Sequence, residues 1–345
     1  MKLLIIGGTR FVGRHLVEAA LARCHEVTLF NRGTYAPVTR DVETIAGDRY
    51  SDLAKLHGRR WDVVLDTCGN VPRAVTSAAE VLRDAVDRYV FISSISAYAD
   101  LSVRGVEETA PLKQLTSEQV DEANRIDTSG QPSYGALYGG LKALCEQALE
   151  QVMPNRVLTV RPGLIVGPHD YTDRFNYWVM RVARGGEVFA PGRPERPVQF
   201  IDARDLAQWM VTMAERREVG VYNANCLPGR VTMKDVLDQC KSSSGSDATF
   251  TWVSERFLQA EPVMAWSEMP LWLPEEDAPQ LNGFMFIDVD KAVAAGLQIR
   301  PLGDTIGDTL AWAKSELSES SLKAGISAER EQALLRKWHQ LNGNR

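Results

Sequence analysis

The sequence predicts an α/β protein, a doubly wound parallel β-sheet with helices on both faces and a smaller C-terminal substrate lobe. Three observations predict it. Short β-branched runs alternate with helical stretches in the first half of the chain, a glycine-rich turn follows the first run, and the composition changes after Pro162. The chain has 345 residues, of which 44% are hydrophobic, so it can bury a large core and is too long for one small domain.

The expected strands and helices follow from the spacing of apolar residues. Apolar residues at helical spacing predict helices over 12–24, 74–86 and 136–152. A strand-to-helix pattern over 201–215 and a strand at 220–224 return to the sheet. The main strands are expected at 3–7, 26–30, 42–47, 61–67, 88–93 and 156–162.

The domain organisation follows the change in composition. We expect a dinucleotide-binding domain over 1–165, to which 198–225 returns, and a substrate-binding lobe made of 166–197 and 226–312. Residues 313–345 are predicted to form a polar connector and a terminal helix. Ser327 is the expected N-cap of that helix, with Leu334 and Trp338 on one face.

Charge and cysteine content exclude several classes of protein. The net charge of -6 argues against a nucleic-acid binder, which needs a basic face. The five cysteines are widely spread without the spacing of a zinc site, which predicts free thiols and no metal. No run reaches the roughly 18 apolar residues of a membrane span, so the sequence predicts a cytoplasmic protein with no membrane segment.

The first strand runs into a glycine-rich turn, "GGTRFVG", that opens a helix. Gly7, Gly8 and Gly13 sit at this junction, where helix amides can hold a pyrophosphate. Glycine suits it because the turn needs a backbone conformation that is costly with a Cβ, and because a phosphate must approach closely. The turn therefore predicts a dinucleotide site.

The end of the second strand bears on which dinucleotide binds. An acid there accepts hydrogen bonds from the ribose 2′-hydroxyl, whereas an arginine accommodates a 2′-phosphate. This chain has Asn31 followed by Arg32, and Arg10 in the turn is expected to project toward the same place. Two guanidinium groups and no carboxylate favour NADP, with NAD as the alternative.

A tyrosine and a lysine stand one turn apart in the third predicted helix. The pKa of a tyrosine hydroxyl is ordinarily about 10, too high for acid–base catalysis near neutral pH. A neighbouring ammonium stabilises the phenolate, so Tyr138 and Lys142 could act together in acid–base catalysis. Ser94, at the carboxyl end of a strand, could donate to a substrate oxygen. Ser93 and Ser96 are expected to be structural, and Tyr134 core or substrate wall.

With these motifs, in this order, the chain resembles the extended short-chain dehydrogenase/reductase superfamily, specifically its NAD-dependent epimerase/dehydratase-like group, over residues 1–312. "GDR" (47–49), "YGGLK" and "RPGLIVGP" extend the resemblance. It implies a Rossmann fold, a bound nicotinamide cofactor and catalytic roles for Ser94, Tyr138 and Lys142. The cofactor-binding residues then expected are Gly7, Gly8, Thr9, Arg10, Phe11, Val12, Gly13, Asn31, Arg32, Asp48, Arg49, Thr67, Cys68, Gly69, Tyr138, Lys142, Pro162, Gly163 and Leu164.

The chain also departs from the pattern of this group. Arg10 replaces the middle turn glycine, as in members similar to the chloroplast stem-loop RNA-binding proteins. Leu164 stands where sugar-nucleotide enzymes often have asparagine, while Ile95 and Ser96 replace the Asp–Glu pair of the dehydratases. Arg196 matches a position that reaches a diphosphate in sugar-nucleotide enzymes, which keeps an anionic substrate open. The candidate substrate residues are Ser94, His169, Arg174, Tyr177 and Arg196.

The leading functional prediction is an NAD(P)-dependent oxidoreductase that interconverts a carbonyl and a secondary alcohol. One alternative is an NAD-dependent epimerase that keeps its cofactor and acts on a sugar nucleotide or related substrate. Another is a non-enzymatic RNA-binding or nucleotide-sensing protein on the same fold, against which the acidic pI near 5.5 and the Tyr–Lys pair argue. A small-molecule substrate is the expected partner, and a homodimer stays open.

Overall fold

The computed structural model describes residues 1–345 except 37, 40–41, 128–133, 277, 319–321 and 343–345. The described chain divides into two compact units. Residues 287–298 pack in the first unit, although the composition placed them in the substrate lobe. Unit 1 comprises Met1–Leu164, Ala203–Asn225 and Ile287–Gln298, and unit 2 comprises Ile165–Asp202, Cys226–Phe286 and Ile299–Arg345.

Unit 1 is built on a parallel sheet whose described strands number seven, in the order β11-β6-β5-β4-β1-β2-β3. This sheet confirms the predicted fold class. Ile6 pairs with Phe30 on one side and Asp66 on the other, so the carboxyl ends of β1, β2 and β4 meet at one edge. The strands are β1 Lys2–Ile6, β2 Glu26–Asn31, β3 Glu43–Ala46, β4 Trp61–Asp66, β5 Val86–Ile92, β6 Val157–Pro162 and β11 Gly220–Ala224.

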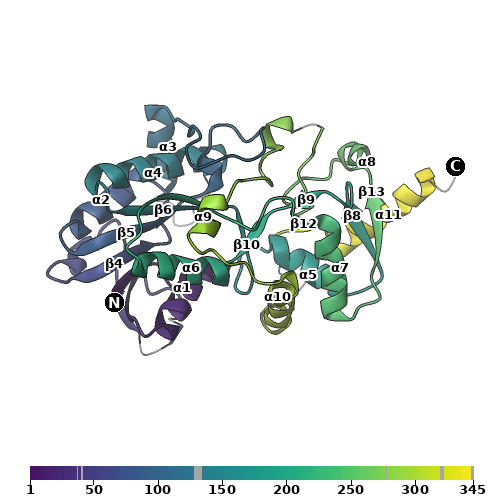
Figure 1. The fold of residues 1–345 in the computed structure, drawn as a ribbon. Helices are drawn as coiled ribbons and strands as arrows, with labels where there is room; N and C mark the ends of the chain where they lie inside the picture. Colours follow the sequence, from purple (N-terminus) through teal and green to yellow (C-terminus); the bar gives the residue numbers. More distant parts are fainter. Residues whose placement is uncertain (37, 40–41, 128–133, 277, 319–321, 343–345) are drawn as a thin grey trace. The chain divides into compact units, whose positions relative to one another are not determined.

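Helices cover the two faces of this sheet. Helices α1 (Phe11–Ala22) and α6 (Ala203–Glu215) pack together on one face, and α2 (Pro72–Leu82) and α4 (Tyr138–Val152) pack together on the other (Figure 1). The other helices of unit 1 are η1 Leu53–Leu56, η2 Ile95–Ala97, α3 Ser117–Asp127, η3 Gly135–Leu137 and α9 Asp290–Ala294.

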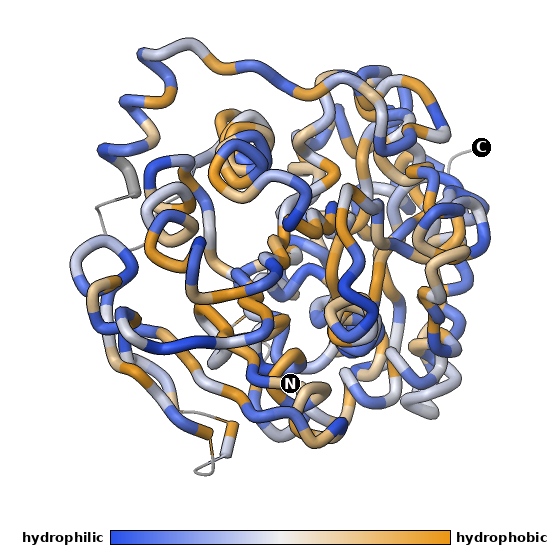
Figure 2. Tube along the Cα trace, turned by 60° about the vertical axis from the view of Figure 1, so that its left-hand side comes forward, coloured by the Kyte–Doolittle hydropathy of each residue, from blue (hydrophilic) through white to orange (hydrophobic). Residues whose placement is uncertain are grey.

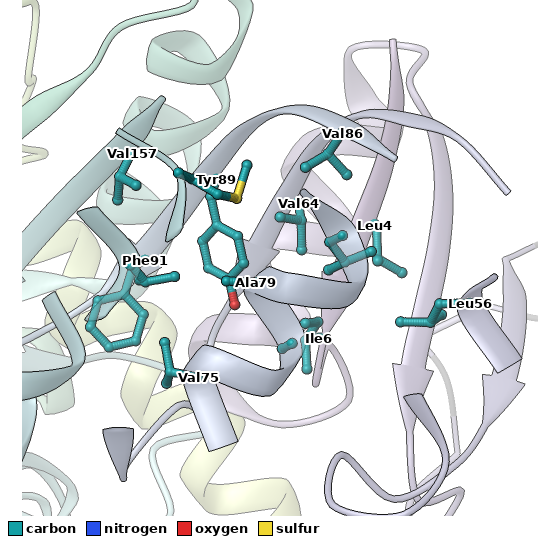
Figure 3. Close-up of a cluster of buried hydrophobic side chains, with 14 of the residues drawn as sticks. Leu4, Ile6, Leu56, Val64, Val75, Ala79, Val86, Tyr89, Phe91 and Val157 are labelled. Carbon is teal, nitrogen blue, oxygen red and sulfur yellow. The ribbon is translucent and has the colours of Figure 1, made fainter. Parts of the chain in front are cut away.

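The core between the sheet and the α2–α4 pair follows from strand periodicity. Alternate residues of a strand face the same side, so Leu4 and Ile6 of β1 face α2, as do Tyr89 and Phe91 of β5 (Figure 3). These side chains are buried almost completely against residues such as Val75. Figure 2 shows orange and blue alternating along the helices, as expected for helices with one apolar face.

Unit 2 contains paired short strands and a helical group in which α5, α7 and α10 pack together. The α10 helix runs to Glu316, three residues past residue 313, the predicted start of the polar connector. Ser327 caps the last helix by accepting a bond from the Arg330 amide, at 3.3 Å. The elements are β7 Leu164–Val166, α5 Arg174–Ala183, β8 Glu187–Pro191, β9 Pro197–Val198, β10 Phe200–Asp202, β12 Val231–Thr232, α7 Met233–Ser244, β13 Thr249–Val253, α8 Glu255–Ala260, η4 Pro279–Leu281, α10 Leu302–Glu316 and α11 Ala328–Asn342.

None of the helices in the described part of the chain combines the length and the apolar character needed to cross a membrane.

Candidate active site

The turn between β1 and α1 has a backbone that requires glycine. Gly7 and Gly8 have φ values of +106° and +88°, in the region that disfavours a Cβ. A Cβ on Gly7 would lie 2.3 Å from Thr67 Oγ1, and one on Gly13 would lie 2.7 Å from the Gly8 nitrogen. The Arg10 side chain does not cap α1. The turn therefore excludes side chains at Gly7 and Gly13, and it leads into the N-terminus of α1, where amides without an intrahelical partner can hold an anion.

Arg10 and Asn31 have different roles at the rim of this turn. The Arg10 guanidinium lies 5.0 Å from the centre of the Tyr35 ring, which is 49% exposed. The Asn31 amide donates to the Gly7 carbonyl at 3.1 Å and accepts from the Gly33 amide at 2.8 Å. Asn31 thus fastens the loop after β2 to the glycine turn, and the exposed Arg32 follows it.

One of the predicted cofactor residues, Arg49, forms a buried ion pair with Asp66, which was not predicted. Arg49 donates to both carboxylate oxygens of Asp66, at 3.1 and 2.9 Å, and Asp66 also accepts from the Tyr89 hydroxyl at 2.7 Å. Burial alone would raise the pKa of Asp66, but the charge and bonds of Arg49 hold it below its usual value. Asp48 accepts from the Tyr50 amide and closes a turn. Arg49 therefore ties the loop after β3 to β4, beside the exposed Cys68.

Lys142 reaches the ends of two strands from α4. Its Nζ donates to the carbonyls of Gly69 and Ile92, at 2.7 Å each, and lies 4.6 Å from the centre of the Phe91 ring. The side chain is only 4% exposed. These bonds place the ammonium at the carboxyl ends of β4 and β5, the edge at which ligands bind in open α/β sheets.

Tyr138 and Ser94 come from the elements that hold Lys142. Tyr138 is the first residue of α4, one turn before Lys142, and is half-buried. Ser94 follows β5 and is 9% exposed, and its hydroxyl accepts from the Ser96 amide at 3.1 Å. Tyr138 thus precedes Lys142 by one helical turn, and Ser94 follows by two residues the Ile92 carbonyl to which the Lys142 ammonium donates.

Gly139 lets α4 approach the segment that carries Ser94. A Cβ on Gly139 would lie 1.9 Å from the Ser96 carbonyl oxygen, a distance at which the helix or the segment has to move. A Cβ on the next residue, Gly140, would lie 2.5 Å from Leu115 Cγ. Gly139 therefore sets how closely α4 and η2 pack, and Gly140 sets how closely α4 packs against Leu115.

The segment after β6 lies at the same edge of the sheet. Pro162 ends β6, and the Gly163 amide donates to the Ala224 carbonyl of β11 at 3.4 Å. A Cβ on Gly163 would lie 2.1 Å from Asn225 Nδ2, so this strand end is closely packed. Leu164 is 8% exposed.

The remaining candidate substrate residues belong to unit 2. His169, with φ of +69°, lies 5.2 Å from the Trp312 ring, and Arg174 lies 5.4 Å from the Trp266 ring. The structure buries Tyr177 to 4% exposure. Arg196 is also buried and forms an ion pair of 3.2 Å with Glu255, which offsets much of its charge. Within the described residues no acidic, cysteine or histidine cluster could hold a metal ion.

Several buried polar residues near the Tyr–Lys helix were missed in the sequence. Glu146 and Arg161 form an ion pair of 2.5 Å in which both side chains are less than a tenth exposed. Arg161 is the one charged residue of the buried strand β6, and Glu146 follows Lys142 by one helical turn. A charge in such a strand needs a buried partner, which is the signal that could have revealed the pair.

The chain matches a known protein family over the segment that contains these candidate site residues. The model of the NAD dependent epimerase/dehydratase family matches residues 3–224. A curated relative, "Chloroplast stem-loop binding protein of 41 kDa b" of Arabidopsis thaliana, is 26% identical over 223 residues, 60% of this chain and 53% of that protein. The chain therefore matches about half the length of this curated relative.

Solved structures match over nearly the whole chain. The UDP-glucuronic acid 4-epimerase from Bacillus cereus, in complex with NAD, covers 91% of this chain and 99% of its own, at 17% identity and a TM-score of 0.65. The UDP-glucose 4-epimerase from Bifidobacterium longum, in complex with NAD+ and UDP, covers 92% and 99%, at 17% identity and a TM-score of 0.62. At these identities the likeness establishes the fold.

Proposed function

Since the chain belongs to the NAD dependent epimerase/dehydratase family, we propose that it is a nicotinamide-dependent oxidoreductase that interconverts a carbonyl and a secondary alcohol. The observation that carries this proposal is the position of Lys142. Its ammonium is held by two strand-end carbonyls, one helical turn from Tyr138. The glycine turn supports the same site, because it excludes side chains at Gly7 and Gly13 and leads into α1, whose first amides could hold a pyrophosphate.

The proposed chemistry divides between the cofactor and three side chains. The nicotinamide, when bound, supplies or accepts the hydride. In the reducing direction Tyr138 donates its hydroxyl proton to the substrate oxygen, and the Lys142 ammonium stabilises the phenolate that remains. Ser94 donates a hydrogen bond to the same oxygen while negative charge develops there. Lys142 would also hold the nicotinamide ribose, since its ammonium lies at the strand ends where ligands bind in open α/β sheets.

We propose NADP as the preferred cofactor. The end of β2 has no carboxylate to repel a 2′-phosphate, and Arg32 and Arg10 provide positive charge beside it. The stack of Arg10 on Tyr35 supports this role by holding the guanidinium in place. Titration calorimetry with NADP and NAD tests the preference. We expect tighter binding of NADP, and equal or tighter binding of NAD would contradict it.

An epimerase that retains its cofactor is the second candidate, because the solved structures described above are epimerases. Mass spectrometry of the purified protein separates the two. Free exchange of cofactor, with net reduction of a carbonyl compound such as the quinone 9,10-phenanthrenequinone, supports the oxidoreductase. A copurifying nucleotide, with conversion of UDP-glucose and no net reduction, supports the epimerase. For the partners we propose a small molecule, with an anionic group as one option, and a homodimer as one assembly.

An RNA gel-shift assay tests the RNA-binding alternative, because the curated relative is named for stem-loop binding. A salt-sensitive shift without any turnover would favour the RNA-binding alternative.

A further inference from the structure

A buried carboxylate stands on the same face of α4 as the Tyr138–Lys142 pair. Glu146 lies one turn after Lys142 and is 7% exposed. Its carboxylate accepts from Arg161 Nε at 3.0 Å and from Arg161 Nη2 at 2.5 Å, and it also accepts from the Ser93 hydroxyl. A buried carboxylate is costly unless it is paired, and here both oxygens have donors.

The donors belong to the strands that form the site. Ser93 follows β5 directly and precedes Ser94, and its amide donates to the Val160 carbonyl of β6 at 2.7 Å. Arg161 is the next residue of β6. The bonds of Glu146 therefore join the middle of α4 to two strands, one of which leads into Ser94.

Arg161 is itself held in place from two further sides. Its Nη1 donates to the Glu108 carbonyl at 3.0 Å, and its guanidinium lies 4.8 Å from the Tyr98 ring. The Tyr98 hydroxyl donates to Asn223 Oδ1 at 2.6 Å. Because each group of this set has a partner, Arg161 is a fixed point to which Glu146 can attach the helix.

Apolar packing alone leaves the position of a helix less well defined. Cys145 and Leu149 of α4 pack in the core, but contacts of this kind tolerate small shifts along or around the helix axis. Bonds to a fixed guanidinium and hydroxyl do not tolerate them, because hydrogen bonds weaken steeply with distance and angle. A shift of α4 would also break the bonds of Lys142 to the Gly69 and Ile92 carbonyls.

We propose that Glu146 is a positioning residue that fixes α4 on β5 and β6, so that Lys142 and Tyr138 keep their places beside Ser94. The inference rests on the proposed function. Glu146 acts through the helix and through Ser93, without contact to substrate or cofactor.

The test compares two variants with a matched control. Glu146→Gln removes the charge of the carboxylate. Ser93→Ala removes the hydrogen bond between Ser93 and Glu146 and leaves the Glu146–Arg161 ion pair in place. This second variant tests the proposal even if Glu146→Gln does not fold. Glu331→Gln is the control, because Glu331 is a carboxylate buried to 2% that pairs with Arg181 at 2.7 Å within unit 2. Lys142→Ala is the reference. For each protein the affinity for NADP is measured by calorimetry, kcat is measured with 9,10-phenanthrenequinone, and Tm is measured by thermal unfolding.

We expect Glu146→Gln and Ser93→Ala to weaken NADP binding about threefold or more and to lower kcat about tenfold or more, since small displacements of reacting groups are costly. Glu331→Gln should lower Tm comparably to Glu146→Gln while NADP affinity and kcat stay within about twofold of wild type. If Lys142→Ala loses both properties but Ser93→Ala and any folded Glu146→Gln match the control, the positioning role is refuted. If Lys142→Ala loses neither, the proposed function itself fails.

Discussion

Replacing Gly139 by alanine adds one methyl group where α4 meets the segment that carries Ser94. The new Cβ would lie 1.9 Å from the Ser96 carbonyl oxygen, whereas real Cβ atoms essentially never come within 3.0 Å of such an atom. The helix and the segment must therefore separate by at least about 1.1 Å. A displacement of about 1 Å between groups that act together can cost about a hundredfold in rate, and overpacking of this kind costs about 1–3 kcal/mol of stability.

Gly307→Ala is the matched control for this substitution. Gly307 lies inside α10, and nothing stands within 4 Å of the position a Cβ would take. The same chemical change should here raise the free energy of unfolding by about 0.4–1 kcal/mol, because alanine has less freedom to lose on folding. The assay is urea unfolding together with turnover of 9,10-phenanthrenequinone by both variants. Gly139→Ala with the turnover and stability of Gly307→Ala would refute this interpretation of the α4–η2 contact.

Two further predictions concern cofactor choice and pH. Arg10→Ala or Arg32→Ala should weaken NADP binding by about 1.5–3 kcal/mol and change NAD binding little. Calorimetry at fixed salt measures both affinities. Equal losses for the two cofactors in Arg10→Ala would mean that Arg10 binds the pyrophosphate that they share. Burial raises the pKa of Asp170 to about 6, above its ordinary value of about 3.9, so its contribution to stability falls as pH rises from about 4 to 6 and stays low above that range. The change in the free energy of unfolding caused by Asp170→Asn should therefore be more favourable at pH 8 than at pH 4, by about 2.4 kcal/mol, and urea unfolding with the same difference at both pH values would contradict this.

The strands and the nucleotide turn could be predicted because their signals are local. The apolar runs before Gly7, Asn31 and Thr67 are short and β-branched, and parallel pairing brings their carboxyl ends to one edge. The spacing of Tyr138 and Lys142 likewise fixes a shared helix face. For these elements the spacing of residues along the sequence is enough to predict the structure.

Other features depend on contacts between residues distant in sequence. Nothing local distinguishes Arg49, which turns inward to Asp66, from an arginine that meets a ligand. Arg196 likewise matches a motif, yet its charge is offset by Glu255, 59 residues away. The packing of 287–298 in unit 1 also depends on distant contacts, such as the bond from the Asn223 side chain to the Asp288 carbonyl. Pairings of this kind can be identified only in the folded structure.

Replacement of Tyr138 by phenylalanine tests the central proposal most directly. The variant keeps the ring and lacks only the hydroxyl that is proposed to transfer the proton. Turnover of 9,10-phenanthrenequinone with NADPH should fall by about two to four orders of magnitude, the usual weight of general acid–base catalysis, while NADP affinity measured by calorimetry stays near that of wild type. Undiminished turnover with intact NADP binding would contradict the proposal, because the proton would then come from another group.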